Sequence, residues 1–257
     1  MLTAEQIQKN WEIFLNNIGV FISGDRKQKL LDFYKEYEDR IIMMPAAHKK
    51  EYHNAFPGGY VEHVNRVITC ALHLHKLWGQ MGADTTTYTE EELVFSALNH
   101  DLGKLGDEEH DSYIPQTDKW RQDKLGEDYM FNNTIPFASV PDRSLFFLHS
   151  NNIQYTFNEM VAIQTHDGLY DEANKKYLMT YMPEQKPRTC LPFVLHFADM
   201  MAARIEFERE WLPKFQGNKS VKDTSNKETR RFVPAAAKQK ALSSVRSEGL
   251  KNLLDNL

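Results

Sequence analysis

The sequence has few cysteines, no long apolar run and no excess of positive charge. Only two cysteines occur in 257 residues, Cys70 and Cys190, each inside an apolar helical pattern. This excludes a disulfide framework and is typical of a reducing compartment. No apolar run approaches the roughly 18 residues that a membrane-spanning helix needs. The first residues, MLTAEQIQKN, lack the apolar core of a secretory signal, so we expect a cytoplasmic protein that does not enter membranes.

The charge balance argues against one common class of partner. The net charge is -5 with histidine neutral, which disfavours a generic nucleic-acid binder that relies on a basic surface. Hydrophobic residues make up 41% and charged residues 26%, as in ordinary globular proteins. The chain is long enough to bury a substantial core.

Helical periodicity runs along most of the chain, and no strand pattern stands out, so we predict an all-α fold. Capping boxes mark three helix starts, at Thr3 with Gln6, Thr89 with Glu92 and Thr156 with Glu159. Other helices are expected to end near Ile41 and to cover Tyr60 to Trp78, Pro141 to Ser150 and Cys190 to about Trp211. We predict four parts: N-terminal helices (1–43), a main helical domain (44–212), a flexible linker (213–233) and a C-terminal amphipathic helix (234–257).

Three separated segments carry histidine and aspartate at helical positions. HNAFPGGYVEHV (53–64) supplies His63, FSALNHDLGK (95–104) supplies His100 and Asp101, and VLHFADMMAA (194–203) supplies Asp199. Imidazole nitrogen and carboxylate oxygen suit Mn²⁺, Fe²⁺ or Zn²⁺, with Mg²⁺ and Ni²⁺ as further options. Asp101 has two oxygens and can bridge two ions. An unpaired Asp199 in an apolar helix would be costly, which favours a metal site.

The order His…His-Asp…Asp, with Leu-Gly-Lys directly after the pair, resembles the HD superfamily of metal-dependent phosphohydrolases. The segment MPAAHKKEYHNAFPGGYVEHV (44–64) is similar to the entrance of YhaM-like HD domains, and the resemblance covers roughly residues 44 to 206. It implies an HD-domain helical bundle and, through further histidines at His149 and His166, a second ion. Many relatives carry His-His-Gly where this chain has His166, Asp167 and Gly168, so the second position of that motif departs from the family pattern.

The expected reaction is hydrolysis of a phosphoester in a nucleotide or short oligonucleotide by metal-activated water. We assign catalytic roles to Asp101 and Lys104, and substrate binding to Lys104, His53 and Arg204. Residues 105–141 are polar and broken by Gly and Pro, and we expect an insertion or lid there. The C-terminal helix is a candidate for homo-oligomer contacts.

Several alternatives stay open at this level. Lys104 could be a favourable charge at a helix C-terminus, His149 and His166 could be ordinary helix-end histidines, and His53 could anchor the turn before Gly58. The same ligand types also serve HD-fold di-iron oxygenases. A non-catalytic module that binds a metal or a nucleotide is the third possibility.

Overall fold

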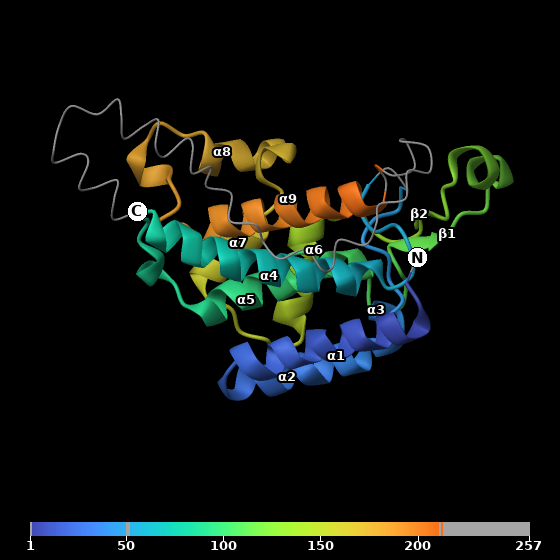
Figure 1. Cartoon of the computed structure of the whole chain (residues 1–257), viewed down its shortest axis with the longest axis horizontal. Coiled ribbons are helices and arrows are strands. Elements are labelled where there is room, and N and C mark those ends of the chain that lie inside the picture. Colours follow the sequence, from blue (N-terminus) through green and yellow to red (C-terminus); the bar gives the residue numbers. More distant parts are fainter. Residues whose placement is uncertain (1, 50–51, 211, 213–257) are drawn as a thin grey trace, which may run out of the picture. The chain divides into compact units, whose positions relative to one another are not determined.

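The computed structural model describes residues 2–49, 52–210 and 212, all within one unit that spans Met1–Gly217. The predicted linker (213–233) and C-terminal helix (234–257) lie outside the described residues. Helices dominate the fold, as predicted, with one small two-stranded sheet (Figure 1). None of the helices in this part of the chain combines the length and the apolar character that a bilayer span requires.

Two N-terminal helices lie side by side along one face of the bundle (Figure 1). The first, α1 (Ala4–Phe21), begins with the predicted capping box of Thr3 and Gln6. The predicted second helix is divided into α2 (Gly24–Glu36) and a short α3 (Glu38–Ile41), with Tyr37 between them. Apolar residues of α1 and α2, among them Trp11, Phe14 and Leu30, are buried, so the pair closes one side of the core.

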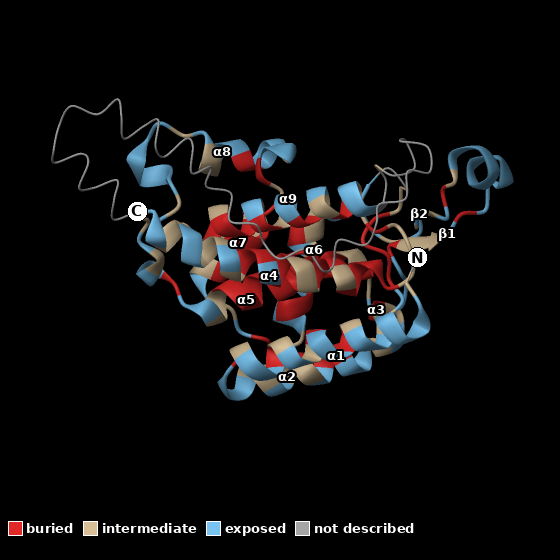
Figure 2. Cartoon of the chain, in the orientation of Figure 1, coloured by how far each residue is buried: buried red, intermediate tan, exposed pale blue. Residues whose placement is uncertain are grey.

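The central bundle consists of α4 (Gly59–Gln80), α5 (Glu90–Asn99), α6 (Val140–Ser150), α7 (Phe157–Thr165) and α9 (Leu191–Glu210). The buried residues gather where α4, α5, α7 and α9 face one another (Figure 2). In α4 the buried residues Val64, Val67, Ile68 and Ala71 repeat at helical spacing. The capping boxes predicted for α5 and α7 are both present.

The position of α5 decides where the functional residues lie. Every residue from Leu93 to Asn99 is buried, which is typical of a helix enclosed by others on all sides. Its end therefore delivers the next two residues, His100 and Asp101, into the protein interior, where each is less than 5% exposed.

A tight turn before α4 depends on two glycines, Gly58 and Gly59. Gly58 has φ +79°, a conformation that residues with a side chain rarely adopt. A Cβ on Gly59 would stand 2.1 Å from the carbonyl oxygen of Asn54. The turn thus holds the loop against the start of α4, one helical turn before His63.

The insertion between α5 and α6 contains a short β-ribbon that the sequence analysis did not predict. Strand β1 (Tyr113–Pro115) pairs antiparallel with β2 (Tyr129–Phe131), with Ile114 opposite Met130, and a π-helical turn, η3 (Arg121–Leu125), lies between them. Strands of three residues are too short to produce a readable alternation, which explains the omission.

Short helical segments complete the fold. They are η1 (Thr85–Thr87), η2 (Leu102–Leu105), η4 (Gly168–Tyr170), η5 (Glu172–Asn174), α8 (Lys175–Leu178) and η6 (Pro183–Gln185). Both cysteines are free thiols, in agreement with the absence of a disulfide framework.

Candidate metal centre

Four helices bring histidine and aspartate side chains to one buried point. Ligand atoms of His63 from α4, His100 and Asp101 from the end of α5, His166 from the end of α7 and Asp199 from α9 form overlapping groups, and His53 from the loop before α4 forms a further group with His63 and Asp101. Within each group the atoms lie within 4.8 Å of one another. The structure therefore brings together five of the six residues that the sequence analysis assigned to metal.

His100 and His166 are oriented by the same local device. Each follows the last residue of its helix, and its Nδ1 lies 2.8 Å from the carbonyl oxygen three residues earlier, Ala97 and Ile163 respectively. Because the last four carbonyls of a helix lack an intrahelical partner, these oxygens are free to accept from Nδ1–H. That bond places the proton on Nδ1 and leaves Nε2 as the donor atom toward the cluster.

His63 lies in the first turns of α4, and α9 contacts both of its ring nitrogens. Its Nδ1 is 3.1 Å from Glu206 Oε2, and its Nε2 is 3.1 Å from Asp199 Oδ1. Asp199 and Glu206 are separated by seven residues, which places them on the same face of α9 two turns apart. The helix that supplies one ligand therefore also orients another.

The two oxygens of Asp101 face different histidines. Oδ2 lies 3.4 Å from His100 Nε2 and 3.8 Å from His63 Nε2, whereas Oδ1 lies 3.5 Å from His166 Nε2. A change from α-helix to the 3-10 turn η2 directly after His100 makes this possible, since Asp101 has φ -104° and ψ 8°. Adjacent residues can then both point into the centre, as a bridging carboxylate requires.

The residues fit a metal ion. Nε2 atoms of His63 and His100 are buried and lack a hydrogen-bond partner; Asp199 approaches His63 closely but without hydrogen-bond geometry. Donor atoms that share one ion at about 2.1 Å stand roughly 3 to 4.2 Å apart, and the histidine-to-aspartate separations here run from 3.1 Å (His63 Nε2 to Asp199 Oδ1) to 3.9 Å (His100 Nε2 to Asp199 Oδ1). Leaving such nitrogens unsatisfied would cost stability, so a bound ion accounts for the arrangement.

Lys104 lies against the carboxylate of Asp101. Its Nζ is 2.5 Å from Asp101 Oδ2. Although burial opposes both charges, the ammonium holds the pKa of Asp101 well below its usual range, and the Asp101 carboxylate raises the pKa of Lys104. Both side chains are therefore charged at neutral pH, and the position immediately beside the ligands carries a fixed cation.

The carboxylates also act on the imidazoles of the metal-free site. Burial opposes the charged form of His63, yet Glu206 and Asp199 raise the pKa of His63 to about 10. Burial likewise disfavours a charged His166, but Asp167 and Asp101 raise the pKa of His166 to about 9. An ion that binds here must displace these protons.

A pocket of about 870 Å³ opens onto the centre, and its size is typical of a small-molecule site. Lys104, His53 and Asp199 line it on the side of the cluster. Aromatic rings from the loop before α4 and from the β-ribbon line another part: His48, Tyr52, Tyr113 and Phe131. The His48 ring lies 4.2 Å from Phe131 and 5.7 Å from Tyr113, centroid to centroid.

His53 and Arg204, both predicted to bind substrate, line this pocket. The His53 ring lies 4.3 Å from that of His63, and its buried Nε2 has no hydrogen-bond partner. Burial, with the charges of His63 and Lys104, lowers the pKa of His53 to about 3, so this imidazole is neutral. Arg204 is exposed and bonds Glu208 through Nε at 2.9 Å.

His149 is not one of the clustered donors, which corrects its assignment as a metal ligand. It is exposed in the last turn of α6 and belongs to none of the groups that could hold an ion. The helix buries Phe147 and Leu148 instead, and successive residues of a helix point about 100° apart. The core-facing side of α6 is therefore not the side that carries His149.

Glu206 is the contributor that sequence reasoning missed. It is buried, with 1% of its surface exposed, and accepts from Arg66 Nε at 3.1 Å as well as from His63. Its spacing of seven residues from Asp199 was a usable signal, because it predicts a second carboxylate on the ligand-bearing face. His196 of α9 also lines the pocket, and its Nδ1 lies 2.8 Å from the carbonyl oxygen of His166.

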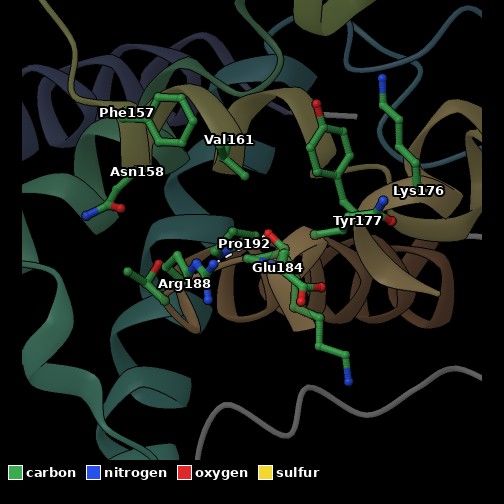
Figure 3. A pocket seen from close by; sticks show the side chains of 12 residues that line it. Phe157, Asn158, Val161, Lys176, Tyr177, Glu184, Arg188 and Pro192 are labelled. Carbon is green, nitrogen blue, oxygen red and sulfur yellow. Dashed lines mark hydrogen bonds between the residues drawn. The ribbon is translucent and has the colours of Figure 1, made fainter. Parts of the chain in front are cut away.

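A separate pocket of about 490 Å³ lies where the start of α7 faces the segment before α9 (Figure 3). Phe157, Tyr177 and Arg188 line it, and none of its lining residues belongs to the metal-ligand groups of the described chain.

The chain matches no family model, and no curated protein or solved structure is significantly similar to it.

Proposed function

We propose that this protein is an HD-type, metal-dependent phosphohydrolase that cleaves a phosphoester bond in a nucleotide or short oligonucleotide in the cytoplasm. The observation that carries the proposal is the convergence of three imidazole nitrogens and two aspartates on one buried point at a pocket. The order of these residues along the chain resembles the HD superfamily, and their spatial arrangement is compatible with that resemblance.

The charge of the site supports metal dependence. In the metal-free site the carboxylates of Asp101, Asp199 and Glu206 are balanced by the Lys104 ammonium and by protons on His63 and His166. A divalent ion that displaces the two imidazole protons would replace their positive charge, which an anionic phosphate needs beside these carboxylates. A divalent ion held by His63, His100, Asp101 and Asp199 would polarise a phosphate oxygen and lower the pKa of bound water. Asp101 Oδ1 and His166 are the donors that would hold a second ion. The number of two ions stays a prediction.

The protein's own residues have separable roles in this proposal. Asp101 bridges the two halves of the ligand set through its two oxygens. Lys104 supplies an ammonium at the pocket side of the centre, where it would bind a phosphate oxygen. His53 offers a neutral imidazole with an unpartnered nitrogen to the bound substrate, and Arg204 lines the same pocket, where its guanidinium would bind a second anionic group.

The aromatic part of the pocket favours a substrate with a base. Phe131 and Tyr52 are about half exposed, at 52% and 51%, although they stand at the edge of a pocket. Nucleobases stack on such rings with a gain of about 1 to 3 kcal/mol per base. A phosphate ester without an aromatic group would leave this wall unused, which supports nucleotides and short oligonucleotides as substrates.

The test combines metal content with turnover. The protein would be purified without chelators, analysed for bound metal, and assayed with Mn²⁺, Fe²⁺ or Zn²⁺ on cyclic dinucleotides, short oligonucleotides and nucleoside phosphates. The variant His100→Ala/Asp101→Ala removes two ligands. His73→Ala is the matched control, since His73 is an exposed residue of α4 whose Nδ1 bonds Thr69 O at 2.8 Å.

We expect metal in the wild-type protein and the control, turnover that a chelator abolishes, and loss of both in the double variant. Bound iron with oxygen consumption but no phosphate release would favour a di-iron oxygenase. Tight nucleotide binding without turnover would favour a binding module. A folded protein that takes up none of the three metals would refute the proposal.

A further inference from the structure

The three histidines of the centre are oriented in two different ways. The Nδ1 atoms of His100 and His166 lie 2.8 Å from carbonyl oxygens of their own helix ends. His63 lies within the first two turns of α4. The carbonyl oxygens of Gly59 and Tyr60, one turn before it, already accept backbone hydrogen bonds of the helix. His63 therefore needs a partner from another element for Nδ1.

Glu206 is that partner. Both of its oxygens lie within hydrogen-bond distance of His63 Nδ1, at 3.1 and 3.3 Å, and the carboxylate is 1% exposed. A buried carboxylate is costly unless it is paired, so Glu206 depends on its polar partners, His63 and Arg66, to remain in the interior. Asp199, on the same face of α9, lies 3.1 Å from the opposite nitrogen of the same ring.

A second set of bonds fixes Glu206 itself. Arg66 Nε donates to Glu206 Oε1 at 3.1 Å, and Arg66 Nη2 donates to Glu62 Oε1 at 2.9 Å. The other oxygen of Glu62 accepts from Asn54 Nδ2 at 3.3 Å. The chain of contacts joins α9 to α4 and to the turn that starts α4, so the carboxylate has little freedom to move away from His63.

We propose that Glu206 is a positioning residue of the metal centre: it holds the Nδ1 proton of His63, aims Nε2 at the ion and makes the imidazole a stronger donor. Partners of this kind fix ring orientation and raise ligand basicity. The inference rests on the metal centre of the proposed function but not on the hydrolytic reaction, so it can be tested without a substrate.

The test measures Mn²⁺ affinity of the full chain for three variants. Glu206→Leu removes the acceptor, and we expect binding to weaken about 10- to 100-fold. Glu206→Gln keeps an acceptor oxygen but loses the charge, so its affinity should fall between those of wild type and Glu206→Leu. Glu159→Gln is the matched control, because Glu159 is also fully buried and paired with an arginine but contacts no ligand; its affinity should equal that of wild type.

A second measurement separates orientation from general stability. With diamagnetic Zn²⁺ bound, the hydrogen-bonded Nδ1 proton of His63 gives a downfield NMR signal, expected in wild type and Glu206→Gln and missing in Glu206→Leu. Equal affinities of Glu206→Leu and wild type would overturn the inference. If Glu206→Leu does not fold, the comparison of Glu206→Gln with Glu159→Gln decides: equal affinities overturn it, and weaker binding by Glu206→Gln supports it.

The outcomes also separate this inference from the proposed function. Weakened metal binding in the Glu206 variants, together with a wild-type protein that has no phosphohydrolase activity, would refute only the proposed reaction. A wild-type protein that binds neither Mn²⁺ nor Zn²⁺ would overturn both. Active enzyme with unchanged metal affinity in Glu206→Leu would overturn only the role of Glu206.

Discussion

Replacing Arg26 with methionine tests how the helices that carry the ligands are held together. Arg26 on α2 donates from Nη1 to both oxygens of Glu159 on α7, at 2.8 and 2.9 Å, and from Nη2 to Glu91 on α5. Its guanidinium also lies 4.3 Å from the ring centroid of Phe95. One side chain thus joins α2 to the two helices whose ends position His100 and His166.

The size of the effect follows from burial. The Glu159 side chain is 0% exposed and that of Arg26 is 16% exposed, so Arg26→Met leaves a buried carboxylate without its cation. Removal of one partner of a buried pair costs about 3 to 5 kcal/mol. The backbone N–H of Thr156 still bonds Glu159, at 2.6 Å, which places the loss near the lower end, about 3 kcal/mol. At roughly 2 to 4 °C per kcal/mol, the melting temperature should fall by roughly 6 to 12 °C.

The pH dependence of this loss has a defined sign. Burial raises the pKa of Glu159 even with Arg26 present, and removal of the cation raises it further. A folded state that favours the protonated acid is penalised above that pKa and relieved as the pH falls through it. The deficit of Arg26→Met relative to wild type should therefore be largest at neutral pH and shrink on acidification.

Urea unfolding at several pH values measures the deficit, and the double variant Arg26→Met/Glu159→Met provides the control. Removing both partners avoids the unpaired charge, so most of the stability should return, less about 1 kcal/mol for the lost capping box of α7. A deficit below about 0.5 kcal/mol, or a double variant no more stable than Arg26→Met, would refute the reasoning.

Three further predictions concern the centre and its support. Gly103→Ala places a Cβ 2.1 Å from a backbone oxygen of α6, so this variant should have a lower melting temperature and a lower Mn²⁺ affinity. Gly19→Ala, with open space around the new Cβ, should lower neither quantity. Elemental analysis should show less bound metal in His166→Ala and unchanged metal in His149→Ala, and the reverse result would restore His149 as a ligand. Because carboxylates raise the pKa of His63 to about 10 and that of His166 to about 9 in the metal-free site, Mn²⁺ competes with protons for both rings. Calorimetry should show an affinity that rises with pH up to about 10 and less steeply above about 9, and a flat profile would contradict this.

The sequence alone determined what depends on local pattern. Capping boxes and helical periodicity located α1, α5 and α7, and their starts are where Thr3, Thr89 and Thr156 placed them. The order of histidine and aspartate along the chain, through its resemblance to the HD superfamily, also predicted most of the clustered donors, since a ligand at a helix end or on an apolar helix face can be recognised in the linear sequence.

Only the tertiary structure decided which side chains meet. His149 looked equivalent to His166, but the side of α6 that packs inward excludes it, and this depends on the rotation of the helix against its neighbours. The bond of Glu206 to His63 joins residues 143 positions apart, and the aromatic wall joins the loop before α4 to a ribbon of three-residue strands. Such contacts follow from how helices and loops pack, because the local sequence fixes an element's start and its apolar face but not the partner that covers it.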